Sequence, residues 1–190
     1  LLKNQRNLAP NTRRNSKTKK NKTCTQRFAI YTGKFDFAYM NPYHLLKSNK
    51  SQGYIPLVND NGRKLFGILV VNKNNPINNP KELNGKTIAF PAPNALGATL
   101  MVRADLKDKF NIQYKPRYVK THPSVYLNVI LDQTSAGGGV LGTLNRQSIE
   151  IKNNLKVIHE TEKVSPHPFA VHPRVPQDVA KSVKEALLEI

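Results

Sequence analysis

The chain of 190 residues contains a single cysteine, no tryptophan, and 12 acidic residues against 30 lysines and arginines. One cysteine, Cys24, excludes an intramolecular disulfide. No apolar run approaches the roughly 20 residues that a helix needs to cross a bilayer, and the amino terminus is too polar and basic for the core of a secretory signal peptide. We therefore expect no disulfide framework and no membrane insertion within this sequence.

Motifs for catalysis and metal binding are also lacking. The sequence has no nucleophile elbow, no zinc-protease motif, no Walker loop and no dinucleotide-binding glycine pattern. Its histidines have no metal-ligand spacing, because His167 and His172 would point to opposite faces of one Pro-flanked strand. Acids such as Asp105 and Glu185 are expected on solvated faces. We therefore expect a protein that is not an enzyme and that carries no metal or cofactor.

The net charge of +18 is unevenly distributed. Residues 1–27 hold nine lysines and arginines and no acid, with no helical or strand period. Three interpretations stay open for this segment: a basic arm that neutralises phosphates, a segment with no fold of its own, or a frameshifted product, since the character changes abruptly at Arg27–Phe28. A basic nucleic-acid-binding protein is disfavoured, because the chain lacks a reading helix, an aromatic RNA-binding strand and a zinc site. We expect no nucleic-acid partner.

From residue 28 onward the pattern alternates between strands and helices over short loops, which predicts an α/β fold with mostly parallel sheets. A helical turn should end at Gly33, and Asn41 followed by Pro42 is a strong helix start. The continuous apolar run Lys64–Asn72 is typical of a buried central strand. Further strands are expected at 35–40, 54–58, 87–90, 114–119, 137–139, 155–159 and 169–172, and further helices at 79–84, 93–109, 124–133, 141–147 and from 177 onward.

Three strand-to-helix junctions, at 40–44, 91–99 and 120–126, are the best candidates for a site. In an open α/β sheet ligands bind beyond the carboxyl ends of strands, where free N–H groups at helix starts favour an anion. The Gly137–Gly139 turn is a fourth candidate, because missing side chains allow close backbone approach. Each has a structural alternative: packing for Tyr43, an N-cap for Asn94, a capping turn for His122, and a tight crossing of backbone for the glycines.

The runs GKFDFAYMNPYH, GILVVNKNNPINNPKELNGKTIAFPAPNALGATLMVRADL and THPSVYLNVILDQTSAGGGV resemble the phosphate/phosphite/phosphonate substrate-binding proteins of ABC transporters. The resemblance covers residues 28–190. It implies a two-lobed type II periplasmic-binding-protein-like fold, hinged by two crossing strands, that captures a small oxyanion. It also implies ligand contacts by Tyr43, at an aromatic helix start, and by His122, after a later strand.

One loop departs from the phosphonate binders of this family. Where they carry a hydroxyl-rich S-T-S-G loop, this chain has Asn94-Ala95-Leu96-Gly97, so backbone N–H groups, the Asn94 side chain and Thr99 would have to hold an oxyanion. We expect weak binding of inorganic phosphate and a preference for an anion with an apolar or neutral substituent. The expected ligand-binding residues are Tyr43, Asn94, Ala95, Leu96, Gly97, Thr99, His122 and Gly138.

The resemblance also implies an organisation. Lobe one would comprise residues 28–67 and 159–190 and would be incomplete, because family members begin with a further strand and helix and continue past Ile190; lobe two would comprise residues 68–158. We expect an extracytoplasmic monomer whose partners are a small anionic solute and an ABC-transporter permease. The alternative is the ligand-sensing input domain of a membrane signalling protein, where a sensor kinase region would replace the permease.

Overall fold

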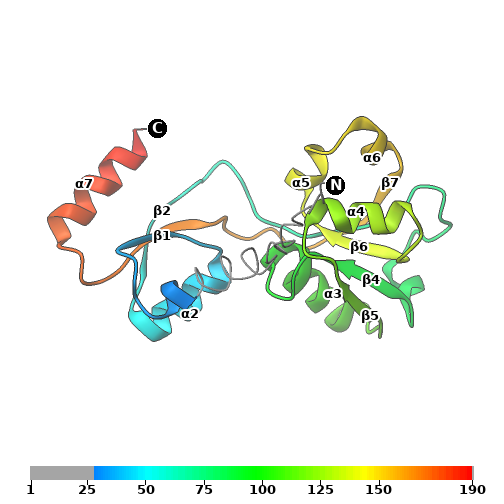
Figure 1. The fold of residues 1–190 in the computed structure, drawn as a ribbon, viewed down its shortest axis with the longest axis horizontal. Coiled ribbons are helices and arrows are strands. Elements are labelled where there is room, and N and C mark those ends of the chain that lie inside the picture. Colours follow the sequence, from blue (N-terminus) through cyan, green and yellow to red (C-terminus); the bar gives the residue numbers. More distant parts are fainter. Residues whose placement is uncertain (1–27, 190) are drawn as a thin grey trace, which may run out of the picture.

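The computed structural model of the chain describes residues 28–189. The expectations for residues 1–27, including Cys24, lie outside these described residues. The described chain forms two α/β bodies, each built on its own sheet and joined by two extended segments (Figure 1). The expected α/β fold class is confirmed. No helix in the described part is both long and apolar enough to cross a membrane.

The smaller body is built on a three-stranded sheet in the order β1-β8-β2. Its strands are β1 (Phe37–Tyr39), β2 (Ile55–Asn59) and β8 (Pro168–Val171), and its helices are α2 (Pro42–Gln52) and α7 (Gln177–Leu188). A helical turn over residues 28–31 precedes them and ends, as expected, at Gly33, whose φ of 67° suits a residue without a side chain. A small core around the buried Tyr54 and Met40 holds this body together.

The larger body is built on a five-stranded sheet in the order β5-β4-β6-β3-β7. Its strands are β3 (Ile68–Asn72), β4 (Thr87–Phe90), β5 (Lys115–Tyr118), β6 (Ala136–Gly139) and β7 (Leu155–Glu160). Its helices are the 3₁₀ helix η1 (Pro80–Leu83), the π-helical segment η2 (Leu96–Met101), α3 (Val102–Asp108), α4 (His122–Ile130), α5 (Leu141–Asn145) and α6 (Ile149–Asn153).

The predicted buried strand is confirmed at β3, but it begins at Ile68, and residues 64–67 lie in the connecting segment instead. Its residues alternate between two cores on opposite faces of the sheet: Leu69 and Val71 pack on the side of α3, and Ile68 and Val70 on the side of α4. All four are fully buried. A strand that is covered on both faces needs apolar side chains at successive positions, which explains the unbroken apolar run in the sequence.

The expectation of mostly parallel sheets is wrong. Only β4 pairs in parallel, with β5 and with β6, whereas β3 is antiparallel to both of its neighbours and β8 is antiparallel to β1 and β2. The reason is the path of the chain between the bodies. Because β3 enters the larger sheet from the smaller body and β7 returns toward it, the two strands run in opposite directions, and the returning β8 inserts between β1 and β2.

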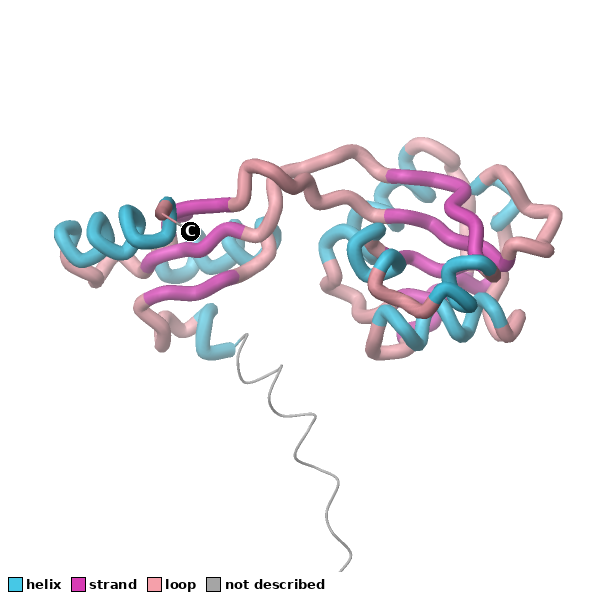
Figure 2. The backbone as a smooth tube through the Cα atoms, turned by 90° about the horizontal axis from the view of Figure 1, so that it is seen from above, coloured by secondary structure: helices cyan, strands magenta, loops and turns pink. Residues whose placement is uncertain are grey.

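The two connecting segments are held against each other where they pass between the bodies (Figure 2). Leu65 and Val164 form an antiparallel bridge, and the Thr161 N–H donates to the Gly67 carbonyl oxygen at 2.9 Å. The buried Gly67 N–H donates to the Thr161 hydroxyl at 2.8 Å. The junction is therefore a hydrogen-bonded two-stranded crossing and not a pair of free linkers.

Three local expectations need correction. The helix expected at 93–109 begins only at Leu96, as a π-helical segment that continues into α3. An unexpected short helix, α6, follows Ser148, whose hydroxyl caps it. Asp105 is not on a solvated face: it is 8% exposed, accepts a 2.7 Å hydrogen bond from His159 and forms a 3.0 Å ion pair with Lys109. The partner of Asp105, His159, lies on β7, 54 residues away, so helix periodicity could not reveal it.

Candidate anion-binding site

One edge of the larger sheet gathers two of the strand-to-helix junctions that the sequence singled out, at 91–99 and 120–126, together with the Gly137–Gly139 segment. β4 is parallel to both β5 and β6, so the carboxyl ends of these three strands lie at the same edge. Each strand then leads into a helical element: β4 into η2, β5 into α4 and β6 into α5. The loop at 91–95 and the turn at 119–121 therefore leave the sheet side by side, which is the arrangement at which α/β sheets bind ligands.

The first turn of α2 supplies residues from the smaller body. The Asn41 side chain accepts a 2.8 Å hydrogen bond from the His44 N–H, and Pro42 occupies the first turn, as predicted. Tyr43 is half-buried, and Lys47 lies one turn further on with its Nζ 4.9 Å from the centre of the Tyr43 ring. The hydrogen bond with Tyr43 raises the pKa of Lys47 above its ordinary value. This turn thus presents a hydroxyl, an imidazole and a cation.

The two bodies meet directly at Asn94. Its amide nitrogen lies 3.3 Å from Nε2 of His44, so the loop after β4 contacts the first turn of α2. The alternative role of Asn94 as a helix cap is wrong, because η2 begins two residues later and its cap position, Ala95, has no side-chain capping bond. The side chain of Asn94 is engaged across the gap between the bodies instead. This contact brings the α2 turn and the sheet edge together.

Two polar atoms on this edge are buried without a hydrogen-bond partner among the described residues: Oγ1 of Thr99 in η2 and Nδ1 of His122 at the start of α4. Buried polar atoms in folded proteins nearly always have partners, so each such exception indicates a site that deserves explanation. Burial lowers the pKa of His122 below its ordinary value of 6.5. Thr134, the third such residue, precedes β6 at the opposite edge of the sheet.

The candidate glycines are used for packing. A Cβ on Gly138 would lie 2.1 Å from the Ala98 carbonyl oxygen and 2.6 Å from the Phe90 ring. A Cβ on Gly97 would lie 2.9 Å from a Val140 methyl carbon. Protein atoms fill the space next to both residues, so the geometry favours the tight backbone crossing over close approach of a ligand. Ala95 and Leu96 are half-buried at the start of η2.

Three residues next to this candidate site were not among the expected ligand contacts, although the junctions at 40–44 and 120–126 include two of them. His44 and Lys47 lie on α2 beside Tyr43, and Lys120 lies in the turn before α4 with a φ of 74°. A positive φ is uncommon for a lysine and marks a constrained turn. Lys47 could have been found from its spacing of four residues from Tyr43, which places both on one helix face. The contact of His44 with Asn94, 50 residues away, left no signal in the sequence.

No group of three or more residues suited to hold a metal ion is found between residues 28 and 189. A cavity of about 610 Å³ lies between α3 and β5, away from the carboxyl ends of β4, β5 and β6. None of the candidate site residues lines it. The residues named above offer hydrogen-bond donors and two lysines, Lys47 and Lys120. None of these residues carries a carboxylate. These are features of a site for a small anion, because donors and positive charge compensate its desolvation.

Solved structures share this two-body architecture. A Xanthomonas citri protein bound to chloride matches with a TM-score of 0.75 and 14% identity, covering 87% of this chain and 67% of its own. PhnD1 of Prochlorococcus marinus in complex with methylphosphonate matches with a TM-score of 0.68 and 13% identity, covering 85% and 65%. A binding-protein component of a Pseudomonas aeruginosa ABC phosphonate transporter matches with a TM-score of 0.62 and 16% identity, covering 86% and 58%.

At such identities these likenesses establish the fold, and the fold is that of the type II periplasmic binding proteins, as predicted. The chain spans about two thirds or less of the length of these three structures. A search of curated proteins found no match. The sequence model of one family, described as ABC transporter, phosphonate, periplasmic substrate-binding protein, matches residues 23–190. The chain belongs to this family, whose members are transporter substrate-binding proteins and not enzymes.

Proposed function

We propose that this chain captures a small oxyanion such as phosphate, phosphite or a phosphonate between the first turn of α2 and the edge formed by β4, β5 and β6. The captured anion would be handed to the permease of an ABC transporter outside the cytoplasm. On this proposal the protein acts as a monomer, with the two bodies as its lobes and the boundaries near residues 67 and 159.

The observation that carries the proposal is the pair of unpartnered buried atoms, Thr99 Oγ1 and His122 Nδ1, at the same sheet edge. Both can donate to an oxyanion: a hydroxyl rotates freely, and a neutral imidazole can place its proton on either nitrogen. An anion that accepted hydrogen bonds from both groups would remove the cost of leaving them unsatisfied. The contact between Asn94 and His44 supports the proposal further, because it brings the α2 turn next to this edge.

The substituent on the anion is inferred from the start of η2. Ala95 and Leu96 are half-buried there and offer apolar surface but no hydroxyl. An inorganic anion would find fewer side-chain donors on this wall, whereas a methyl or larger group could pack against Leu96. We therefore propose that an alkylated anion such as methylphosphonate binds more tightly than inorganic phosphate.

Titration calorimetry against phosphate, phosphite, methylphosphonate and sulfate tests the proposal. We expect saturable binding with a Kd below about 1 mM, or roughly −4 kcal/mol, for at least one of them. Tyr43→Phe and His122→Ala should each weaken binding about tenfold or more, because a charge-assisted hydrogen bond contributes about 1.5–3 kcal/mol.

His172→Ala is the matched control, because His172 packs its ring edge-on against Tyr54 in the smaller body and its Nδ1 accepts from the Arg174 N–H. This variant should lower the melting temperature and leave the affinity unchanged. Absence of binding below millimolar concentration for all four anions would contradict the proposal. Equal losses of stability and affinity in His122→Ala would assign that residue a structural role instead.

A further inference from the structure

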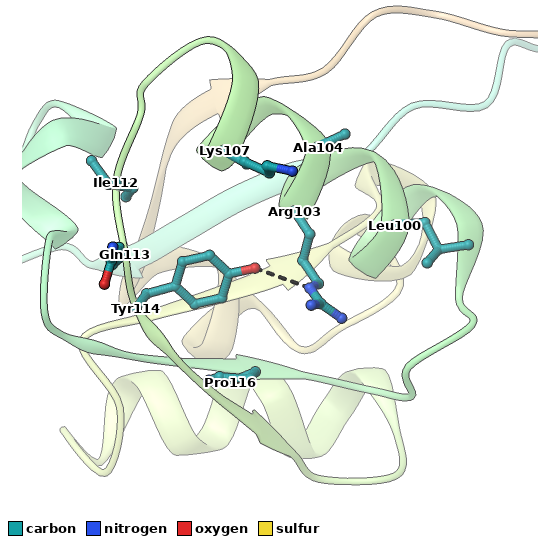
Figure 3. A pocket seen from close by; sticks show the side chains of 8 residues that line it. All are labelled: Leu100, Arg103, Ala104, Lys107, Ile112, Gln113, Tyr114 and Pro116. Carbon is teal, nitrogen blue, oxygen red and sulfur yellow. Dashed lines mark hydrogen bonds between the residues drawn. The ribbon is translucent and has the colours of Figure 1, made fainter.

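The cavity between α3 and the edge strand β5 contains basic residues and lies apart from the proposed oxyanion site. It has a volume of about 610 Å³ and is bounded by α3 and by the segment that leads into β5 (Figure 3). The residues at 112–116 enter β5 at its amino end, which is the opposite end from the turn that leads to His122. The proposed function does not use this cavity.

Arg103 is held in one orientation at this cavity. Its Nε donates to the Tyr114 hydroxyl and its Nη1 donates to the Tyr118 hydroxyl, each at 3.0 Å. Figure 3 shows the guanidinium and the Tyr114 ring meeting from α3 and from the strand side. A guanidinium has five N–H donors, so three remain for another acceptor. Because two hydroxyls already fix the side chain, a ligand would lose little of its binding free energy in ordering it.

The positive charge at the cavity is not neutralised by the protein. Lys107 lies one helical turn after Arg103 and is exposed, and between residues 28 and 189 neither cation forms an ion pair. Burial raises the pKa of Tyr114, so this hydroxyl stays neutral and does not offset the charge of Arg103. Two cations spaced four residues apart on one helix face repel each other, and an anion between them would relieve that repulsion.

The rest of the cavity wall is apolar apart from Gln113. Leu100, Ala104, Ile112 and Pro116 contribute aliphatic surface beside the two cations. A bare inorganic ion would leave this surface in contact with water, whereas an organic body would cover it.

The edge of β5 is poorly suited to receive another strand. The N–H groups of Lys115 and Val119 point toward β4, so the backbone nitrogens of Pro116 and Tyr118 face the free edge of the sheet. Proline has no N–H to offer there, which blunts the edge against pairing with an extended peptide. The occupant is therefore a small molecule in preference to a peptide strand.

We propose that this cavity is a second binding site, for a small organic anion that carries a phosphate or carboxylate group on an apolar body. The anionic group bonds to the free N–H groups of Arg103 and to Lys107, and the apolar body packs against Leu100 and Ile112. The site does not depend on the proposed function, because it shares no residue with the oxyanion site.

Phenyl phosphate is the probe, and backbone amide shifts of Ala104 and Gln113 in NMR titrations are the reporter. We expect saturable shifts at both amides, and a Kd at least fivefold weaker for inorganic phosphate, which lacks the apolar body. Lys107→Gln should weaken binding of phenyl phosphate about tenfold, since it removes an exposed cation without disturbing the core. Arg103→Lys should weaken it by a similar factor, because it keeps the charge but loses the oriented fork.

Lys184→Gln on the exposed face of α7 is the matched control for the change in net charge and should leave the affinity unaltered. His122→Ala should also leave these shifts unaltered, which separates this site from the proposed oxyanion site. Shifts that do not saturate by about 10 mM, roughly −3 kcal/mol, would overturn the proposal. An equal loss of phenyl phosphate affinity in Lys107→Gln and Lys184→Gln would also overturn the proposal. So would equal affinities for inorganic phosphate and phenyl phosphate.

Discussion

At His122, two properties of a single residue bear on function. Its Nδ1 is buried without a partner among the described residues, and burial lowers its pKa below 6.5, so the ring is neutral at neutral pH. An oxyanion next to the ring would favour the imidazolium and raise that pKa again. Binding would then be coupled to uptake of a proton.

The pH dependence of sulfate binding tests this coupling, because sulfate keeps the same charge between about pH 5 and pH 8. We expect the sulfate affinity of the unaltered protein to rise several-fold as the pH falls below 6.5 toward the lowered pKa that His122 has in the anion-free protein. In His122→Gln this rise should be clearly smaller, because the contribution of His122 is removed. A pH profile that is the same in both proteins would exclude His122 as the titrating group.

Without an anion, the free energy of unfolding should decrease as the pH falls, whereas the anion affinity increases. The unfolded chain takes up a proton at His122 near pH 6.5, whereas the folded chain does so only at lower pH. Above pH 6.5 His122 therefore does not lower the free energy of unfolding. As the pH falls from 6.5 toward the lowered pKa of His122, the free energy of unfolding decreases. His122→Gln should remove this part of the acid destabilisation in urea unfolding, and His172→Gln should not.

At the scale of single elements, the start of η2 differs most from the expectation. Its cap position is Ala95, which has no side chain to accept a bond from the first free N–H groups. By contrast, η1 begins with a complete capping box in which Asn79 and Glu82 exchange hydrogen bonds. The first N–H groups of η2 therefore have no side-chain cap.

Replacing Ala95 and Leu96 by Ser and Thr tests whether this start faces the anion. Two added hydroxyls should strengthen phosphate and methylphosphonate binding several-fold in calorimetry, and a Ser cap should add about 0.5–2 kcal/mol to the free energy of unfolding. Asn79→Ala, which removes the η1 cap, should lower stability by about 1 kcal/mol and leave anion affinity unaltered. If the double change leaves every anion affinity the same, η2 starts in a packed position and the proposed site is misplaced.

At the scale of the whole molecule, the crossing segments determine how the two bodies are joined. The buried Gly67 N–H has the Thr161 hydroxyl as its acceptor, and a Cβ on Gly67 would lie 2.2 Å from the Gly97 carbonyl oxygen. The crossing is therefore packed directly against the start of η2. Hinged closure of two lobes would have to bend the chain around this point.

Thr161→Val tests the importance of this crossing. The substitution keeps the shape of the side chain but removes the acceptor, so the Gly67 N–H is left buried and unpaired. We expect a loss of about 1–3 kcal/mol in the free energy of unfolding, measured with urea. Thr161→Ser keeps the hydroxyl and should lose clearly less of the free energy of unfolding. Unaltered stability in Thr161→Val would show that water or another group satisfies Gly67.

The sequence by itself determined most of the local structure. Asn41 with Pro42 predicted the start of α2, Gly33 predicted the end of the helical turn before it, and the apolar run around β3 predicted a strand buried on both faces. These features depend on residues within one or two turns of each other, because backbone preference and capping act locally. The resemblance of the motifs to one family correctly predicted the two-lobed fold.

The tertiary structure alone decided how distant residues meet. Strand direction depended on the return path of β7 and β8, and the burial of Asp105 depended on His159 in another element. The contact of His44 with Asn94 joins residues 50 apart. Each depends on where the folded chain places groups far apart in sequence, and side-chain periodicity carries no information about that. The chemistry of a site therefore follows from contacts between elements, whereas the elements follow from their own residues.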